Sequence, residues 1–308
     1  MRKLNYIRTC ILGLLLLGAV VANAQQEIIG VAFEFLQQNN LDSAKAAINR
    51  AVVLPETAND PLAWQVRGYV YKSIYFKTEK NNKRSPARIE ALNSLKKSIV
   101  LDEAKEIYTE NTTALKFLIN SLHNDAAASL EAANKNLNPA DYELAIELFK
   151  KSQEFYKIIN PDPAVNQEKQ IEFDLALGLV YNTFIESSKK DSTRTFKYRR
   201  LAKNLYNKVL VVDPDNVSAN YSMGILYYNQ AVELILASEY GDLEELERLQ
   251  DNSDKLFKAS LPFMEKAYTL DPTRPETLQG LTGIWFSLHE TEKSNIYRQK
   301  LQDIEKPK

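Results

Sequence analysis

The sequence contains very little cysteine and histidine. Its 308 residues include one cysteine, Cys10, and two histidines, His123 and His289. Neither histidine has a second histidine or paired carboxylates three or four positions away, as zinc-binding helices have. A lone cysteine gives neither an intramolecular disulfide nor a thiolate metal site. We therefore expect no metal and no cofactor, and we assign the two histidines to packing or to the surface.

Glycine is also scarce, and the net charge is close to zero. The nine glycines form neither a phosphate-cradling loop nor a nucleophile elbow. A formal net charge of −1 gives no support for nucleic-acid binding. Since no catalytic constellation is present either, we predict that the protein is not an enzyme and does not bind nucleic acid.

The N-terminus has the order of a secretory signal peptide. Three basic residues precede an apolar run over residues 11–21, and the Ala-Asn-Ala of residues 22–24 forms a small-x-small cleavage site. The run is short for a membrane-spanning helix. We predict that residues 1–24 are removed and that the protein is exported, with the periplasm as the expected compartment. An anchor formed by an uncleaved signal is the alternative.

The rest of the chain has helical periodicity. Leu, Ala, Glu and Lys dominate at helical spacing, and the eleven prolines lie mostly between the apolar periodic segments. No long stretch alternates apolar and polar residues, as a half-buried strand would. The sequence therefore predicts an all-α fold.

A spacing of 4, 3 and 5 residues recurs before several prolines. It joins Ala202, Tyr206, Val209 and Pro214, and again Ser260, Met264, Ala267 and Pro272. After such a stop, another helical segment places a large, a small and an aromatic residue in order, as in Trp64, Gly68 and Tyr71. Because each unit of this kind buries only part of its apolar surface alone, neighbouring units have to stack.

This pattern resembles the tetratricopeptide repeat family. The resemblance implies a right-handed superhelical solenoid of antiparallel helix hairpins over residues 25–308, in one domain of about six units. Residues 104–160 match the pattern least. Pro55, Pro214 and Pro272 should each follow the end of a second helix, since proline cannot continue one.

The chain departs from the family at one place in each unit. The ordinary repeat of about 34 residues separates the small residues of its two helices by about 12 positions. Here Gly68 and Ala91 are 23 positions apart, Gly178 and Ala202 are 24 apart, and Gly224 and Ser260 are 36 apart. We therefore predict that several hairpins are lengthened and that their tips lie along one edge.

The resemblance also implies a concave groove lined by fixed positions of the first helices. These are Gln65, Tyr69, Lys72, Leu175, Leu179, Asn182, Tyr221, Ile225, Tyr228, Asn229, Gln279 and Phe286. Tyrosine, amide and aliphatic side chains suit an extended peptide or a partner's helix. In the alternative interpretation, the aromatic residues fill gaps in the core. Lys72 is the only cation in this set, so a clamp for acidic carboxylates is not expected.

The lengthened tips are predicted to carry charge. Basic residues gather around Arg88 in one tip and around Lys197 in another, and acidic residues gather in a third. The members of this charged edge are Lys83, Arg84, Arg194, Arg199, Arg200, Glu244 and Glu245. Such an edge could orient a partner or approach anionic lipid head groups. A simple solvated face is the alternative.

These features together favour a non-catalytic protein–protein interaction scaffold of the cell envelope, which binds a peptide or a partner protein in its groove. A glycan-binding or nutrient-uptake accessory protein and an enzyme with an unrecognised site in residues 104–160 are the alternatives. Peripheral contact with a membrane stays open, as does the oligomeric state.

Overall fold

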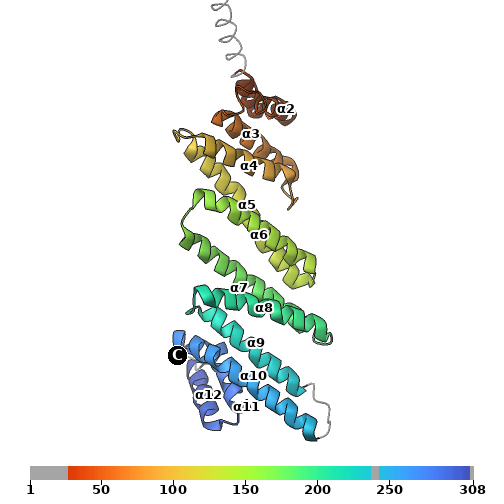
Figure 1. Cartoon of the computed structure of the whole chain (residues 1–308), viewed down its shortest axis with the longest axis vertical. Helices are drawn as coiled ribbons and strands as arrows, with labels where there is room; N and C mark the ends of the chain where they lie inside the picture. Colours follow the sequence, from red (N-terminus) through yellow and green to blue (C-terminus); the bar gives the residue numbers. More distant parts are fainter. Residues whose placement is uncertain (1–26, 237–242, 306–308) are drawn as a thin grey trace, which may run out of the picture. The chain divides into compact units, whose positions relative to one another are not determined.

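The computed structural model describes residues 27–236 and 243–305 (Figure 1). The predicted signal peptide, residues 1–24, lies outside them. Throughout these ranges every regular element is a helix, which confirms the all-α prediction. No helix in the same ranges is both long and apolar enough to cross a bilayer.

The helices follow one another in antiparallel pairs (Figure 1). The pairs are a helix over residues 27–37 with α2 (Leu41–Ala51), α3 (Pro61–Ile74) with α4 (Pro86–Leu101), α5 (Tyr108–Asn136) with α6 (Pro139–Ile159), α7 (Pro163–Ser187) with α8 (Ser192–Val212), α9 (Val217–Leu236) with α10 (Leu243–Leu270), and α11 (Pro275–Ser287) with α12 (Thr291–Glu305). A π-helical segment, η1 (Tyr75–Glu79), extends α3.

The helix ends follow the chemistry of their flanking residues. Pro55, Pro214 and Pro272 come shortly after α2, α8 and α10 end, as predicted. At the start of α3, the carboxylate of Asp60 accepts a hydrogen bond of 2.8 Å from the amide of Leu62. This bond satisfies one of the amides that a helix N-terminus leaves without an intrahelical partner.

The prediction of lengthened hairpins is confirmed. Helices α7 and α8 have 25 and 21 residues, and α9 and α10 have 20 and 28. The last pair is much shorter, with 13 residues in α11 and 15 in α12. The extra residues therefore extend helices, as the sequence suggested, and the connections stay short where the structure describes them.

Glycines bring the two helices of three pairs close together. A Cβ atom on the glycine would lie 2.5–2.7 Å from the partner's side chain in each pair: Gly68 with Leu95, Gly178 with Tyr206, and Gly224 with Met264. Each partner comes four residues, one helical turn, after the small residue at 91, 202 or 260. A large side chain therefore covers the glycine, and the small residue lies beside it. The hydroxyl of Ser260, for example, donates to the carbonyl of Gly224 over 2.7 Å.

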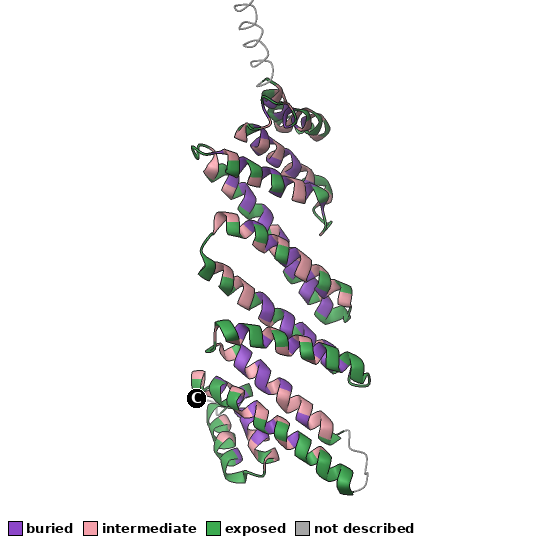
Figure 2. Ribbon diagram, viewed as in Figure 1, coloured by how far each residue is buried: buried purple, intermediate pink, exposed green. Residues whose placement is uncertain are grey.

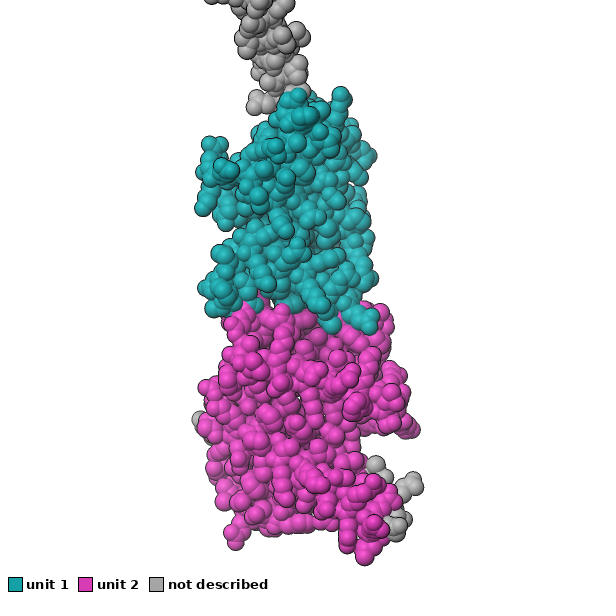
Figure 3. Space-filling model, viewed as in Figure 1, with its two compact units in different colours: residues 1–129, 143–166 teal, residues 130–142, 167–308 magenta. Residues whose placement is uncertain are grey.

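The chain divides into two compact units (Figure 3). Unit 1 comprises residues 1–129 and 143–166, and unit 2 comprises residues 130–142 and 167–308. The first has a core around Ile48 and Val66, and the second a core around Phe257 and Met264. Buried residues follow the facing sides of the helices within each unit (Figure 2).

One predicted member of the charged tips is not exposed. Arg88 is fully buried, and its guanidinium lies 2.6 Å from the carboxylate of Asp125 on α5 and 3.2 Å from the hydroxyl of Tyr75. The expectation of an exposed charge is therefore wrong for Arg88. A buried guanidinium is retained because its partners compensate for lost hydration, and here they join α4 to α5 inside unit 1.

Candidate partner-binding surface

One side of α3 and η1 in unit 1 carries a row of apolar and polar residues that is exposed at its two ends, Leu62 and Phe76. Leu62, Gln65, Tyr69, Lys72 and Phe76 follow at intervals of three and four residues, which places them on the same side of α3 and η1. Leu62 is 45 % exposed, Tyr69 and Lys72 are half-buried, and Gln65 is buried. This row, the α3 face, brings together the three groove residues predicted for the second unit.

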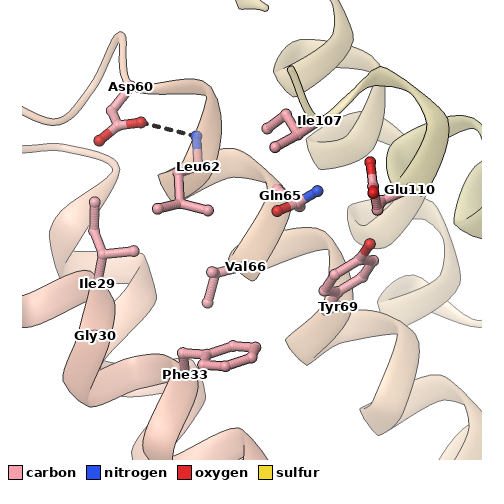
Figure 4. Close-up of a pocket in the computed structure, with 10 residues that line it drawn as sticks. All are labelled: Ile29, Gly30, Phe33, Asp60, Leu62, Gln65, Val66, Tyr69, Ile107 and Glu110. Carbon is pink, nitrogen blue, oxygen red and sulfur yellow. Dashed lines mark hydrogen bonds between the residues drawn. The ribbon is translucent and has the colours of Figure 1, made fainter. Parts of the chain in front are cut away.

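The α3 face opens on a cavity of about 660 Å³ (Figure 4). Ile29, Gly30 and Phe33 of the first helix line one side, and α3 lines the other with Leu62, Gln65, Val66 and Tyr69. Figure 4 shows the apolar side chains of the two helices facing each other across this space. The remaining wall comes from Asp60 and from Ile107 and Glu110 at the start of α5. The cavity is therefore apolar, with polar groups at its margin.

The charged groups that line the cavity are acidic. The carboxylate of Asp60 already caps α3, whereas Glu110 is exposed. Burial raises the pKa of Tyr69, and the negative charge of Glu110 raises it further. Burial lowers the pKa of Lys72, whose ammonium lies 5.1 Å from the centre of the Phe117 ring. At neutral pH, Tyr69 therefore presents a neutral hydroxyl that can donate and accept hydrogen bonds.

The sequence analysis missed part of this surface. Leu62 and Phe76 continue the spacing of Gln65, Tyr69 and Lys72 in both directions, so the same periodicity could have found them. Phe33 and Phe117 are also exposed large apolar residues. They come from other helices, and their place beside α3 depends on the tertiary fold.

The candidates on α7 lie at a smaller cavity in unit 2. Leu179 is 59 % exposed, and with Asn182 it lines a cavity of about 530 Å³. Leu175 is half-buried on the same helix. The amide of Asn182 donates to the hydroxyl of Tyr206 over 3.0 Å, so this residue also joins α7 to α8.

The candidates on α9 pack against other helices of unit 2. Tyr221, Ile225 and Tyr228 contact the core cluster, and burial raises the pKa of both tyrosines. The ring of Tyr228 lies 5.6 Å from that of Phe257, while Arg274 lies 4.1 Å from the centre of the Tyr221 ring. This environment favours the alternative that these residues fill the core, and their role in a groove stays a prediction.

Three further candidates lie on α9 and α11. Asn229 is half-buried, and Gln279 is exposed. Phe286 is 63 % exposed and lines a cavity of about 570 Å³ together with Leu246, Leu249 and Phe257 of α10. Five of the twelve predicted groove residues thus line three separate cavities, and three others belong to one packed cluster.

Several residues of the predicted charged edge form internal contacts. Lys83 donates to Ser129 over 2.9 Å, and Arg84 lies 2.9 Å from Glu147. The hydrogen bond from Arg84 holds the pKa of Glu147 below its usual value. Arg199 lies 2.5 Å from Glu233.

The other members of the charged edge are exposed, namely Arg194, Arg200, Glu244 and Glu245. Glu245 lies 3.8 Å from Arg248 of its own helix. Because Arg84 is exposed as well, the exposed members of this edge occur in both units: at Arg84 in unit 1, and at the starts of α8 and α10 in unit 2.

The two histidines belong to different units. His123 is half-buried on α5, with its ring centre 6.0 Å from that of Phe149, and His289 is exposed in the turn after α11. In the ranges that the structure describes, no group of three or more His, Cys, Asp or Glu side chains is placed to hold a metal ion. That the protein lacks catalytic activity stays a prediction.

No family model and no curated protein matches the sequence. Solved structures give matches of low similarity. PilW, described as a widely conserved type IV pilus biogenesis factor, is 15 % identical, covers 91 % of this chain and 93 % of its own, and has a TM-score of 0.29. PilF of Pseudomonas aeruginosa is 14 % identical, covers 92 % of both chains and has a TM-score of 0.34.

A tetratricopeptide repeat protein from Parabacteroides merdae is 17 % identical, covers 93 % of this chain and 95 % of its own, and has a TM-score of 0.23. Such low scores transfer no function to this chain. The tetratricopeptide-like fold is instead evident in its own helix pairs and in the glycine contacts that join them.

Proposed function

We propose that this protein is a non-catalytic scaffold that binds a partner protein through the α3 face of unit 1. The observation that carries the proposal is an open apolar cavity next to the half-buried hydroxyl of Tyr69 and the exposed carboxylate of Glu110. Large apolar side chains beside a few fixed polar groups are typical of the centre of a protein interface.

The cavity indicates the chemistry of the segment that it receives. Its apolar walls suit an aromatic or branched aliphatic side chain of the partner. Because Asp60 and Glu110 are acidic, a lysine or arginine next to that side chain would find an opposite charge at the margin. Further along the α3 face, the exposed ring of Phe76 extends the apolar surface toward Phe117, 6.2 Å away.

The cell envelope is the proposed compartment. This proposal rests on the predicted signal peptide of residues 1–24, which would direct the mature chain across a membrane. A partner would then be an exported protein or the exported part of a membrane protein. The α3 face does not depend on this location, so the binding and the compartment can be tested separately.

The test compares partners captured by two forms of the protein. The mature chain, residues 25–308, is immobilised and exposed to an envelope extract, and bound proteins are quantified by mass spectrometry. Leu62→Glu places a charge at the mouth of the apolar cavity, while a glutamate in the first turn of α3 is compatible with the helix dipole. We expect about tenfold less of the specific partner on this variant, because an apolar contact at an interface centre contributes about 1–2 kcal/mol or more.

Ile296→Glu is the matched control. Ile296 is exposed on α12 and lines none of the three cavities described above. It should capture the same partner as the unsubstituted protein. Equal loss on both variants, or equal capture by all three forms, would show that the α3 face is not the binding surface. If no protein is enriched at all, the scaffold proposal itself fails.

A further inference from the structure

The unequal helix lengths in unit 2 leave part of one helix uncovered. At about 1.5 Å per residue, α10 is about 42 Å long and α11 about 20 Å. Helix α11 packs on the second half of α10, where Gly280 contacts Met264. The first half of α10 extends past the end of α11 (Figure 1).

The uncovered part of α10 lines a groove with apolar residues and also with polar ones, among them Gln250, Ser253 and Asp254. Leu246, Leu249 and Phe257 of α10 line it together with Ile235 at the end of α9 and Phe286 near the end of α11. Its volume is about 570 Å³. Asp254 is the acidic residue among those that line the groove, and Glu247, two turns before it, lies on the same side of α10. The exposed residues Glu244, Glu245 and Asp251 lie on other sides of the same helix. Arg248 is the one basic residue among residues 243–254, and we call this surface the acidic groove.

The start of α8, also in unit 2, has the complementary chemistry. Phe196 is 66 % exposed there, and it is surrounded in sequence by exposed cations. Phe196, Lys197 and Arg200 lie within one turn of each other on the outward side of the helix, and Arg194 lies nearby. Arg199 points elsewhere, toward Glu233 of α9. We call Arg194, Phe196, Lys197 and Arg200 the basic tip.

We propose that the acidic groove of one copy receives the basic tip of a second copy, and that the protein therefore forms a homodimer. Phe196 would enter the acidic groove, while Lys197 and Arg200 would face Asp254 and Glu247. Since unit 2 carries both surfaces, two copies related by a two-fold axis can make the contact twice, which closes the assembly. The buried ring supplies affinity, and the charges orient the two copies. This contact uses none of the residues of the α3 face.

The first measurement is the mass of the unsubstituted mature chain in solution. Sedimentation velocity at roughly 50 µM should show a dimer, and the dimer should weaken with dilution. It should also weaken as salt shortens the screening length from about 10 Å at 0.1 M to about 3 Å at 1 M. A monomer at both salt concentrations overturns the proposal.

Charge reversal identifies the surfaces. Lys197→Glu with Arg200→Glu makes both surfaces acidic, and Glu247→Lys with Asp254→Lys makes both basic. Each double variant alone should dimerise at least about tenfold more weakly, which is about 1.4 kcal/mol. An equimolar mixture should form a dimer with one copy of each, because both contacts then join opposite charges. If each variant dimerises like the unsubstituted protein, or if the mixture stays monomeric, the assignment is wrong.

Two controls separate these surfaces from a general effect of charge. Lys150→Glu with Lys157→Glu makes the same change in net charge at exposed positions of α6 in unit 1, and it should leave the dimer intact. Phe196→Ser changes no charge and should weaken the dimer by about tenfold or more. Circular dichroism verifies that each variant keeps its helical content. A dimer that tolerates Phe196→Ser, or that is lost in the α6 variant, contradicts the proposed contact.

Discussion

Helix α3 in unit 1 and helix α9 in unit 2 carry equivalent residues in different surroundings. Counted from the glycine that packs against the following helix, Tyr69 corresponds to Ile225, and Lys72 corresponds to Tyr228. On α3 this side opens on a cavity. On α9 it is covered by α11, where a Cβ atom on Gly283 would lie 2.7 Å from the hydroxyl oxygen of Tyr228.

The difference shows that two separate features decide whether a side chain on this side of the first helix of a pair is covered or exposed. The position in the repeat sets the direction in which the side chain points. The neighbouring hairpin then decides whether that side chain is covered. Helix α11 brings a glycine to Tyr228, so the ring fits beneath it. At Tyr69, the neighbouring segment brings Ile107 and Glu110 to the margin and leaves the space open.

The largest expected effect is a difference in stability between two tyrosine substitutions. Tyr228→Ala should lower the free energy of unfolding by roughly 2–4 kcal/mol, because it removes a ring packed on Phe257. Tyr69→Ala should lower it by about 1 kcal/mol or less, since the ring lines an open cavity. Urea unfolding followed by circular dichroism measures both. Tyr228→Phe, which keeps the ring, is the control and should cost about 1 kcal/mol or less.

Similar losses for the two alanine variants would remove the contrast. In that case Tyr69 would be as much a core residue as Tyr228, and the α3 face would lose its central member as a binding surface. A small loss for both would instead mean that α11 covers Tyr228 without contributing to stability.

A pair of glycine substitutions tests whether α11 covers Tyr228 while the cavity beside α3 stays open. In Gly283→Ala the new Cβ atom would meet the hydroxyl of Tyr228, so the ring or α11 has to move, at a cost of about 1–3 kcal/mol. Gly30 lines the cavity in unit 1, and a Cβ atom there would have no neighbour within 4 Å. Gly30→Ala should therefore raise stability by about 0.5–1 kcal/mol through helix propensity. Effects of the same sign in thermal unfolding would contradict this account.

The helical fold and the sites of lengthening could be predicted from the sequence, because both depend on local spacing. The stops at Pro55, Pro214 and Pro272 follow from the missing amide of proline. The distances between the small residues at 68 and 91 and at 224 and 260 indicated longer helices, since short connections could not hold so many extra residues. These signals can be read from the sequence without knowing which residues contact each other in the folded protein.

The environment of each candidate residue could not be predicted in the same way. Gln65 and Tyr221 occupy the same repeat position, yet the first lines a cavity and the second lies beneath Arg274. Arg88 belongs to a run of basic residues, and its burial depends on partners such as Asp125, 37 positions away. Long-range contacts of this kind leave no periodic signal in the chain.

The smallest expected effect concerns Lys72, the residue of α3 that corresponds to Tyr228. Lys72→Met keeps an unbranched side chain next to Phe117 and removes the charge, so at neutral pH stability should change by less than about 1 kcal/mol.

Burial lowers the pKa of Lys72 from its ordinary value of 10.5. Between the lowered value and 10.5 the unfolded chain binds more protons at this site than the folded chain does. The stability of the unsubstituted protein relative to Lys72→Met should therefore rise as pH increases toward 10.5. Urea unfolding of both proteins at several pH values up to that point measures this difference. If this stability difference falls as pH rises, negative charge around the cavity outweighs the effect of burial on Lys72. That result would sharpen the contrast with Tyr228, whose neighbours Phe257 and Gly283 carry no charge.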